Sequence, residues 1–208
     1  MTHVEPPPRI PAEFLSPYDT KAHIMHATIA DVIADTAQNS IEAGARHVRV
    51  SLVEDGATIA VRIQDDGKGM DEATQARAFN PFYTEPGKHD KRKVGLGLPI
   101  LKQLCEATDG AVSLRSEKGV GTELTYSFSA RHIDLPPMGD LAQMVLMLFN
   151  YPGEFDLTFR HEKADESYEI SRSELAEAVG GLESAEGLAL AKEFLRSQEE
   201  ALPNLILV

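Results

Sequence analysis

The sequence predicts an α+β protein, because strand-like segments occur in pairs and helix-like segments lie before and between the pairs. Four segments alternate apolar and polar residues with the period of two that is typical of strands: residues 47–54, 57–65, 111–117 and 122–130. Asp55-Gly56 joins the first two, and this dipeptide favours the tight turn of a β-hairpin. The glycine-rich residues 118–121 join the other two in the same way.

Helices are expected around these hairpins. Residues 20–44 predict the first, because alanine and isoleucine recur there at helical spacing and Gly44 is a candidate C-cap. Residues 71–79 predict a short helix with acidic residues in its first turn, where they complement the helix dipole. Residues 98–110 predict a third helix, in which Pro99 is tolerated because it lies in the first turn.

The chain changes character after residue 130. A linker-like stretch is followed by segments that predict a helix, a hairpin and two acidic amphipathic helices. We therefore divide the chain into a proline-rich arm (1–19), a first domain (20–130) and a small acidic α+β domain (131–208). The last part contains no recognisable catalytic cluster, which favours contacts with a partner over chemistry of its own.

Charge and composition exclude several classes of protein. With 20 Lys and Arg against 33 Asp and Glu, the net charge of −13 argues against a nucleic-acid or membrane-surface partner. The longest apolar run, residues 144–149, is far too short to span a bilayer. The first residues lack both the cationic and the apolar part of a signal peptide. A lone Cys105 excludes a disulfide framework, so a cytoplasmic protein is expected.

Gly95 and Gly97, in the stretch KRKVGLGL, suggest a phosphate-bearing ligand. Neither the P-loop pattern nor the dinucleotide-binding fingerprint is present, and two glycines alone are a weak signal. Three further blocks accompany them. Asp35 and Asn39 lie one helical turn apart, Asp65 ends a strand in DDGKGM, and the block GVGTEL leads into the last strand of the first domain.

These four blocks, in this order, resemble the ATP-binding domain of the GHKL superfamily, shared by gyrase, histidine kinases, the large heat-shock chaperone and mismatch-repair ATPases. The resemblance covers residues 20–130. The C-terminal stretch is similar to small histidine-kinase-like ATP-binding proteins that lack a dimerisation and phosphoacceptor domain. The resemblance implies a Bergerat-type two-layer α/β sandwich with a small C-terminal α+β appendage. Three helices would cover one face of a mixed, largely antiparallel sheet, and ATP would lie between helices and a lid.

The resemblance also implies roles for Asn39 and Asp35. The amide oxygen of Asn39 suits a Mg²⁺ ion that keeps several waters and bridges phosphates. Asp35 matches the position of a glutamate general base in hydrolysing relatives, so it is either the catalytic base or a ligand of Mg²⁺ through water. Two departures weigh against efficient hydrolysis: the shorter side chain at position 35, and Gln38 where an acidic residue is often found.

Five residues are expected to bind the adenine ring. The carboxylate of Asp65 would accept a hydrogen bond from the adenine amino group, which guanine lacks. Gly67 and Gly69 would let the backbone pass close to the base, because they have no Cβ. Met70 would pack on the face of the adenine, and Thr122 would support the ring through a water molecule.

The phosphates are expected at the GLGL block and the basic residues before it. Glycine would expose backbone N–H groups there, and the following helix would add the positive end of its dipole. The residues of this phosphate block are Arg92, Lys93, Gly95, Leu96, Gly97 and Leu98.

The expected function is that of a regulatory Mg-ATP-binding protein with slow hydrolysis or phosphoryl transfer to a partner protein. Only residues 1–19 precede the first helix, so no phosphoacceptor helix pair is expected and neither is ordinary autophosphorylation. Three classes stay open: a kinase acting on a partner, an ATP-dependent conformational switch and a non-catalytic ATP or ADP sensor. The partner would be a regulatory or substrate protein that the sequence does not name, and a homodimer also stays open.

Overall fold

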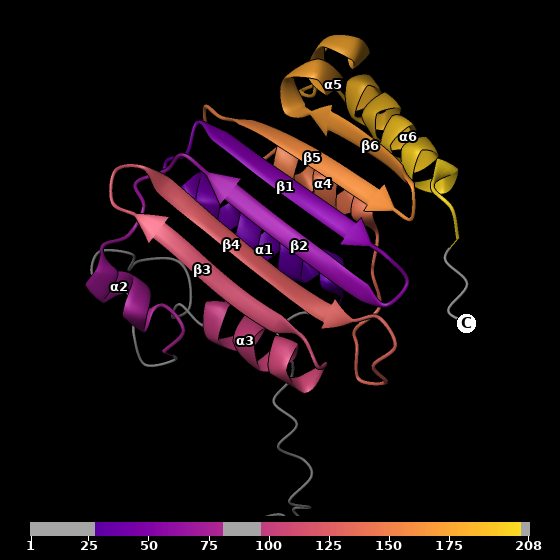
Figure 1. Ribbon diagram of the computed structural model, residues 1–208. Coiled ribbons are helices and arrows are strands. Elements are labelled where there is room, and N and C mark those ends of the chain that lie inside the picture. Colours follow the sequence, from indigo (N-terminus) through magenta and orange to yellow (C-terminus); the bar gives the residue numbers. More distant parts are fainter. Residues whose placement is uncertain (1–27, 81–96, 205–208) are drawn as a thin grey trace, which may run out of the picture.

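A six-stranded sheet forms the centre of the computed structural model, which describes residues 28–80 and 97–204. The strands lie in the order β3-β4-β2-β1-β5-β6 (Figure 1). Their bounds are β1 (His47–Glu54), β2 (Thr58–Asp65), β3 (Ala111–Glu117), β4 (Gly121–Ser129), β5 (Asp156–Lys163) and β6 (Glu166–Ser171). All neighbouring pairs are antiparallel except β1 and β5, which run parallel. The predicted mixed, largely antiparallel sheet is therefore confirmed.

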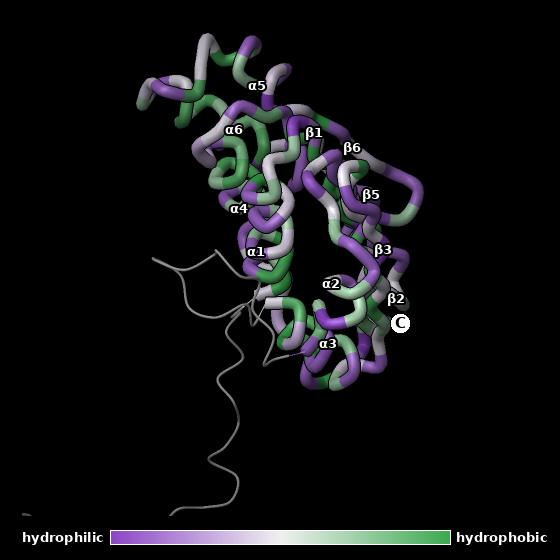
Figure 2. Tube along the Cα trace, turned by 90° about the vertical axis from the view of Figure 1, so that its left-hand side faces the viewer, coloured by the Kyte–Doolittle hydropathy of each residue, from purple (hydrophilic) through white to green (hydrophobic). Residues whose placement is uncertain are grey.

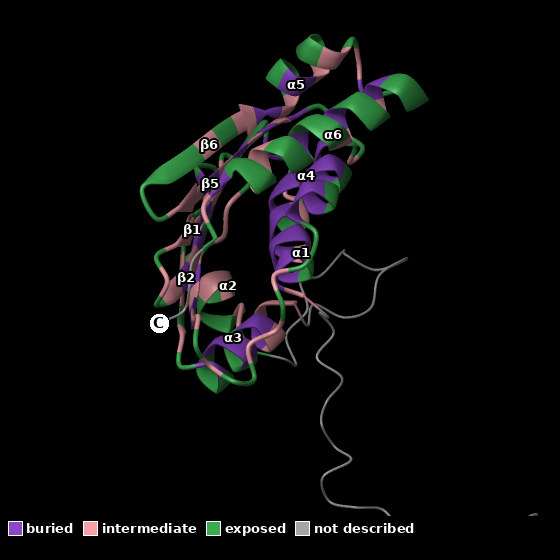
Figure 3. Ribbon diagram, turned by 90° about the vertical axis from the view of Figure 1, so that its right-hand side faces the viewer, coloured by how far each residue is buried: buried purple, intermediate pink, exposed green. Residues whose placement is uncertain are grey.

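Helices cover one face of this sheet. Their bounds within the described ranges are α1 (Ile29–Glu42), α2 (Glu72–Arg77), α3 (Gly97–Ala107), α4 (Leu141–Phe149), α5 (Arg172–Val179) and α6 (Ala185–Ala201). Figure 3 shows α1, α3, α4 and α6 on the same side of the strands, and none of the helices in residues 28–80 and 97–204 on the other side. Figure 2 shows this helix layer beside the strands, with hydrophobic residues recurring along its helices. The fold is the expected two-layer α/β sandwich.

The core lies between the two layers, because each central strand has one apolar face. In β1, Val48, Val50 and Leu52 are at most 2% exposed, whereas Arg49 between them is exposed. Side chains alternate across a strand, so this pattern points every second residue at the helices. The buried residues of strands and helices form one hydrophobic cluster.

Local hydrogen bonds fix the β1–β2 turn, which was predicted, and the start of α1, whose cap was not predicted. The β1–β2 turn is closed by Asp55, whose Oδ1 accepts the N–H groups of Ala57 (2.8 Å) and Thr58 (2.6 Å). Helix α1 begins at Ile29 because Thr28 caps it: the threonine hydroxyl accepts the N–H of Asp31, and the Asp31 carboxylate accepts the N–H of Thr28. The earlier part of the expected first helix lies outside the described residues.

The residues after position 130 extend the same sheet. β5 pairs with β1 from His47↔Asp156 to Glu54↔Lys163, and α4 packs against α1. The hydrophobic cluster contains residues from both sides of position 130. The domain boundary at 130 concerns independent folding and stays a prediction, but the two parts share one sheet and one core. Within the part of the chain that the structure describes, no helix is long and apolar enough to cross a membrane.

Candidate nucleotide-binding site

The predicted adenine residues meet at one end of the sheet, where β2 ends and β4 begins. Asp65 is the last residue of β2 and pairs directly with Thr122, the second residue of β4. The inward-facing hydroxyl of Ser116 on β3 lies 2.9 Å from the Thr122 hydroxyl. Ser116 also accepts the backbone N–H of Met70 and donates to the carbonyl of Gly121. A chain of hydroxyl groups thus ties Met70 to the start of β4.

Both carboxylate oxygens of Asp65 are held by neighbours. Oδ1 accepts the N–H of Gly67 at 2.9 Å, and Oδ2 accepts the Ser40 hydroxyl at 2.6 Å. Ser40 belongs to α1 and is buried, so the carboxylate is fixed between the helix layer and the sheet. Each carboxylate oxygen can accept a second hydrogen bond, so Asp65 keeps acceptor capacity for a ligand.

Asp66, the next residue, binds the start of β1 instead. Its Oδ1 accepts the N–H groups of Arg46 (2.7 Å) and His47 (2.9 Å), and its Oδ2 lies 2.7 Å from Nδ1 of His47. The hydrogen bonds from His47 and Arg46 outweigh the slight desolvation and lower the pKa of Asp66 to about 2. Asp66 therefore secures the start of β1, while the Asp65 carboxylate lies between Ser40 and Gly67.

Two glycines allow backbone segments to approach each other closely at this end of the sheet. Gly69 has φ +59°, and a Cβ there would lie 1.9 Å from the carbonyl oxygen of Glu117. Gly121 has φ +143°, and a Cβ there would lie 2.0 Å from the carbonyl oxygen of Asp65. Only glycine fits either position without moving the backbone of its neighbour.

Gly97 brings the start of α3 against the polar residues of α1. A Cβ on Gly97 would lie 2.9 Å from Oδ2 of Asp35 and 4.0 Å from Nδ2 of Asn39. Asp35 is half-buried and Asn39 is exposed. The first described turn of α3 therefore lies directly beside the Asp35 side chain.

Residues 26–132, just over half of the chain, match the sequence family described as "Histidine kinase-, DNA gyrase B-, and HSP90-like ATPase". The chain belongs to this family. Among relatives of this histidine kinase-like ATPase domain is the heme sensor protein HssS of Staphylococcus saprophyticus, which is 37% identical over 105 residues. That match covers 50% of this chain and 22% of HssS. The sensor histidine kinase YcbM of Bacillus subtilis is 33% identical over 100 residues, covering 46% of this chain and 32% of YcbM. The chain therefore matches a third or less of these relatives' length.

A solved structure supports the fold of this ATPase domain. The N-terminal domain of a DNA repair protein superimposes with a TM-score of 0.54 at 12% sequence identity, over 78% of this chain and 59% of that chain. At this identity the likeness concerns architecture alone. Since it covers more of the chain than residues 26–132, it extends beyond the segment that matches the family.

The ATPase-domain residues present here have the chemistry that a magnesium nucleotide requires. Asp65 offers an oriented acceptor, Asn39 offers an exposed amide, and Gly97 lets the backbone of α3 approach the Asp35 carboxylate closely. In the described ranges no group of three or more His, Cys, Asp or Glu side chains could hold a metal ion by itself. A metal bound here by protein groups alone would be under-coordinated, whereas Mg²⁺ commonly keeps its waters and binds phosphate oxygens.

The outcome for the remaining predicted residues is mixed. Arg92, Lys93, Gly95 and Leu96 lie outside the described residues. Leu98 is half-buried in the first turn of α3 and packs against the hydrophobic core.

Ser40 and Ser116 were missed by sequence reasoning, although they hold Asp65 and Met70 in place. The only signals in the sequence are that Ser40 follows Asn39 and that Ser116 falls on the inward-facing register of its strand.

Proposed function

We propose that this chain binds Mg-ATP between α1, α3 and the β2–β4 end of the sheet, and that it regulates a partner protein with slow hydrolysis or phosphoryl transfer. The observation that carries the proposal is the anchoring of Asp65 by Ser40 and Gly67. A carboxylate fixed through both oxygens, at the end of a strand, has a defined orientation and still has an acceptor site on each oxygen.

Adenine selectivity follows from the charge of this acceptor. The amino group of adenine would donate to Asp65, whereas guanine places a carbonyl oxygen at the same ring position. Two acceptors facing each other repel and leave a polar group without its hydrogen bond, which costs about 1–3 kcal/mol. ATP and ADP should therefore bind in preference to GTP.

The phosphate end is assigned to Asn39, Asp35 and the start of α3. Mg²⁺ would bridge phosphate oxygens and neutralise their charge when the nucleotide is bound. Asn39 would contribute its amide oxygen to that ion, while Asp35 would orient a water molecule or the hydroxyl of a substrate.

A regulatory role is favoured by how α1 is held at both ends. The N–H groups of Ile29 and Ala30 donate to the carbonyls of Pro137 (2.9 Å) and Met138 (2.8 Å). At the other end, the Tyr151 hydroxyl donates to Glu42 at 2.7 Å. The helix that carries Asp35 and Asn39 is thus fastened to residues after position 130, so a ligand that displaces α1 would also displace those residues.

The single cysteine, which is buried, fits a cytoplasmic setting.

Nucleotide binding measured by calorimetry with Mg²⁺ tests the proposal, using ATP, ADP and GTP on wild type, Asp65→Asn and Asp66→Asn. We expect wild type to prefer adenine nucleotides and Asp65→Asn to lose most of the affinity. The neighbouring Asp66→Asn variant makes the same chemical change in a residue that only secures β1, so it should keep the preference. Equal binding of ATP and GTP by wild type would contradict the proposal.

The alternative is a non-catalytic ATP or ADP sensor, and Asp35→Asn separates it from the catalytic classes. In a kinase or ATPase, this variant should keep nucleotide affinity and lose turnover. In a sensor, wild type should have no turnover to lose and the variant should bind as wild type does. Release of labelled phosphate, with and without candidate partner proteins, distinguishes the two.

A further inference from the structure

His161 is a buried histidine in the part of the chain that lies outside the ATPase family match. It belongs to β5, and its side chain is 1% exposed. Its ring lies among aromatic side chains, with ring centroids 6.4 Å from Phe159 and 6.2 Å from Tyr168. A histidine at such a position is usually neutral unless specific partners stabilise its charge.

Both ring nitrogens of His161 face carboxylates. Nε2 lies 3.0 Å from Oε1 of Glu54, the last residue of β1. Nδ1 lies 3.1 Å from both carboxylate oxygens of Glu199, near the end of α6. A neutral imidazole has one N–H group, and an ionised carboxylate only accepts hydrogen bonds. With both carboxylates ionised, the two contacts can be satisfied together only if the ring carries two protons, as an imidazolium does.

The surrounding charges are balanced. Lys163 lies 3.5 Å from Glu54, and the Tyr168 hydroxyl donates to Glu199. Two carboxylates thus face one ammonium and one imidazolium, so the protonated state is neutral as a group. A neutral, hydrogen-bonded group is the form in which buried charges are tolerated.

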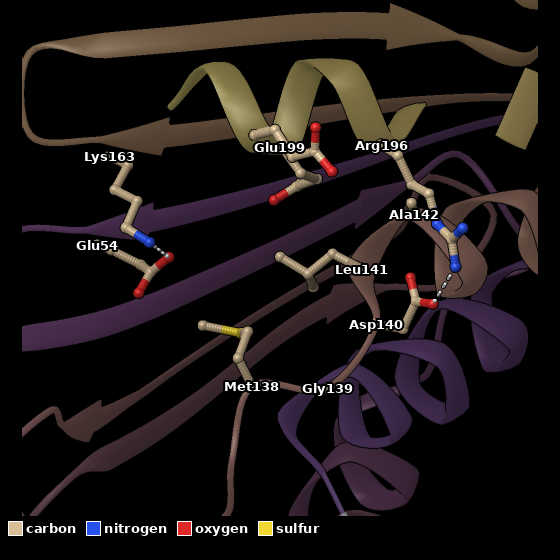
Figure 4. A pocket seen from close by; sticks show the side chains of 10 residues that line it. Glu54, Met138, Gly139, Asp140, Leu141, Ala142, Lys163, Arg196 and Glu199 are labelled. Carbon is tan, nitrogen blue, oxygen red and sulfur yellow. Dashed lines mark ion pairs between the residues drawn. The ribbon is translucent and has the colours of Figure 1, made fainter. Parts of the chain in front are cut away.

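A cavity of about 320 Å³ is lined by Glu54 and Glu199, the two carboxylate partners of His161. Figure 4 shows Glu54 and Lys163 on one side of the cavity, Arg196 and Asp140 on the other, and Glu199 between them. Arg196 and Asp140 form an ion pair at 3.6 Å, and Glu200 completes the charged lining. The cavity thus reaches the carboxylates that contact His161, and these can pass protons to its ring through their hydrogen bonds.

We propose that His161 is a proton-binding site that forms a pH-sensitive switch: its imidazolium ties the C-terminal turns of α6 to the end of β1, and loss of the proton releases them. After deprotonation, one carboxylate faces a ring nitrogen that no longer donates. That buried carboxylate loses a charged hydrogen bond, and the end of α6 can regain solvation for it by moving outwards. The rest of α6 stays packed through Ala191 and Leu195.

The direction of the pH dependence follows from two opposing effects on the pKa of His161, burial and the contacts with two glutamates. Burial disfavours the charged form, but the hydrogen bonds and charges of Glu199 and Glu54 outweigh it and raise the pKa of His161. The contact is therefore complete below the pKa of an unfolded histidine, about 6.5, and it is lost as pH rises through the folded pKa. The pKa of Glu54 is lowered despite its desolvation, so that carboxylate stays ionised through this range.

Nuclear magnetic resonance of the full chain with ¹⁵N-labelled histidine tests the protonation state. We expect both ring nitrogens of His161 to show imidazolium shifts at pH 6.5, with a titration midpoint above that value. Glu199→Gln should lower the midpoint by about one pH unit or more, because it removes an opposite charge in direct contact. Glu200→Gln, the same change one residue further on, should leave the midpoint nearly unchanged. A wild-type midpoint at or below 6.5, or equal effects of the two variants, would overturn the proposal.

Hydrogen exchange separately tests whether the C-terminal turns of α6 are released when His161 loses its proton. With exchange rates corrected for pH, protection of the amides in residues 196–201 should fall as pH passes the His161 midpoint. The opening equilibrium should rise by about tenfold for each unit by which the folded pKa exceeds the unfolded one. Amides of α1 serve as the internal reference. Constant protection of residues 196–201 across the midpoint would refute the release of α6.

Discussion

Replacing Ser40 by alanine tests whether the anchored carboxylate of Asp65 determines nucleotide affinity. Ser40 is buried in α1, and its hydroxyl donates to Oδ2 of Asp65 at 2.6 Å. The substitution removes one oxygen atom and leaves the helix propensity slightly improved. Asp65 keeps its hydrogen bond from Gly67 but loses the one that fixes its orientation relative to α1.

The expected losses of stability and of ATP affinity in Ser40→Ala are estimated from this one hydrogen bond. A hydrogen bond to a charged group contributes about 1.5–3 kcal/mol, and the half-buried position of Asp65 lets water replace part of it. We therefore expect unfolding to become easier by about 1–2 kcal/mol, which lowers Tm by about 2–8 °C in a chain of this size. If the same energy is lost from ATP binding, Kd rises by about 5- to 30-fold.

Thermal unfolding and calorimetric titration with Mg-ATP measure the two effects. Thr36→Val is the matched control, because Thr36 lies on the same helix and its hydroxyl forms a buried contact of 3.1 Å with Tyr126, away from Asp65. The control should lose stability while keeping its ATP affinity. If Ser40→Ala is destabilised but binds ATP as tightly as wild type, the role given to Asp65 is wrong.

Three further substitutions have defined outcomes. Gly121→Ala should cost about 4 kcal/mol or more, because it combines a positive φ with a backbone clash, and urea unfolding will show whether the variant stays folded at all. Gly97→Ala should change stability by less than about 1 kcal/mol but displace Asp35, so turnover should fall more than stability; unchanged turnover would argue against a catalytic Asp35. Asp66→Asn should be less stable than wild type at pH 7, since the folded pKa of Asp66 is lowered. The difference should disappear as pH falls from 4 towards 2, as urea midpoints measured across that range will reveal.

The strands and helices could be predicted because their signals are local. β1 was expected at residues 47–54 and forms there, since alternation and the Asp55-Gly56 turn both act within a few residues. The parallel pairing of β1 with β5 could not be predicted in this way, because no local signal specifies which distant strand lies beside another. The sequence therefore contained no indication that β5 continues the sheet beside β1, while the domain boundary at residue 130 stays a prediction.

The site could be predicted only as far as residue identity carries its chemistry. Asp65, Asn39 and the glycines were assigned because they stand in four blocks that resemble the family, and their roles at a nucleotide stay predictions. Ser40 and Ser116 were not, because a serine is common and its role depends on what the fold places opposite its hydroxyl. The same holds for His161, whose two carboxylate partners come from residues 54 and 199.

The position of β5 beside β1 also protects the protein from aggregation. A chain ending at residue 130 would leave β1 at the border of the sheet, with its backbone N–H and carbonyl groups free on one side and Val48, Val50 and Leu52 next to them. Such an uncovered apolar strand can recruit strands of other molecules. β5 occupies that border, and the outermost strand becomes β6, whose exposed Glu166 and Glu169 disfavour further strand addition. The acidic C-terminal part thus protects the ATPase sheet from self-association as well as completing its core.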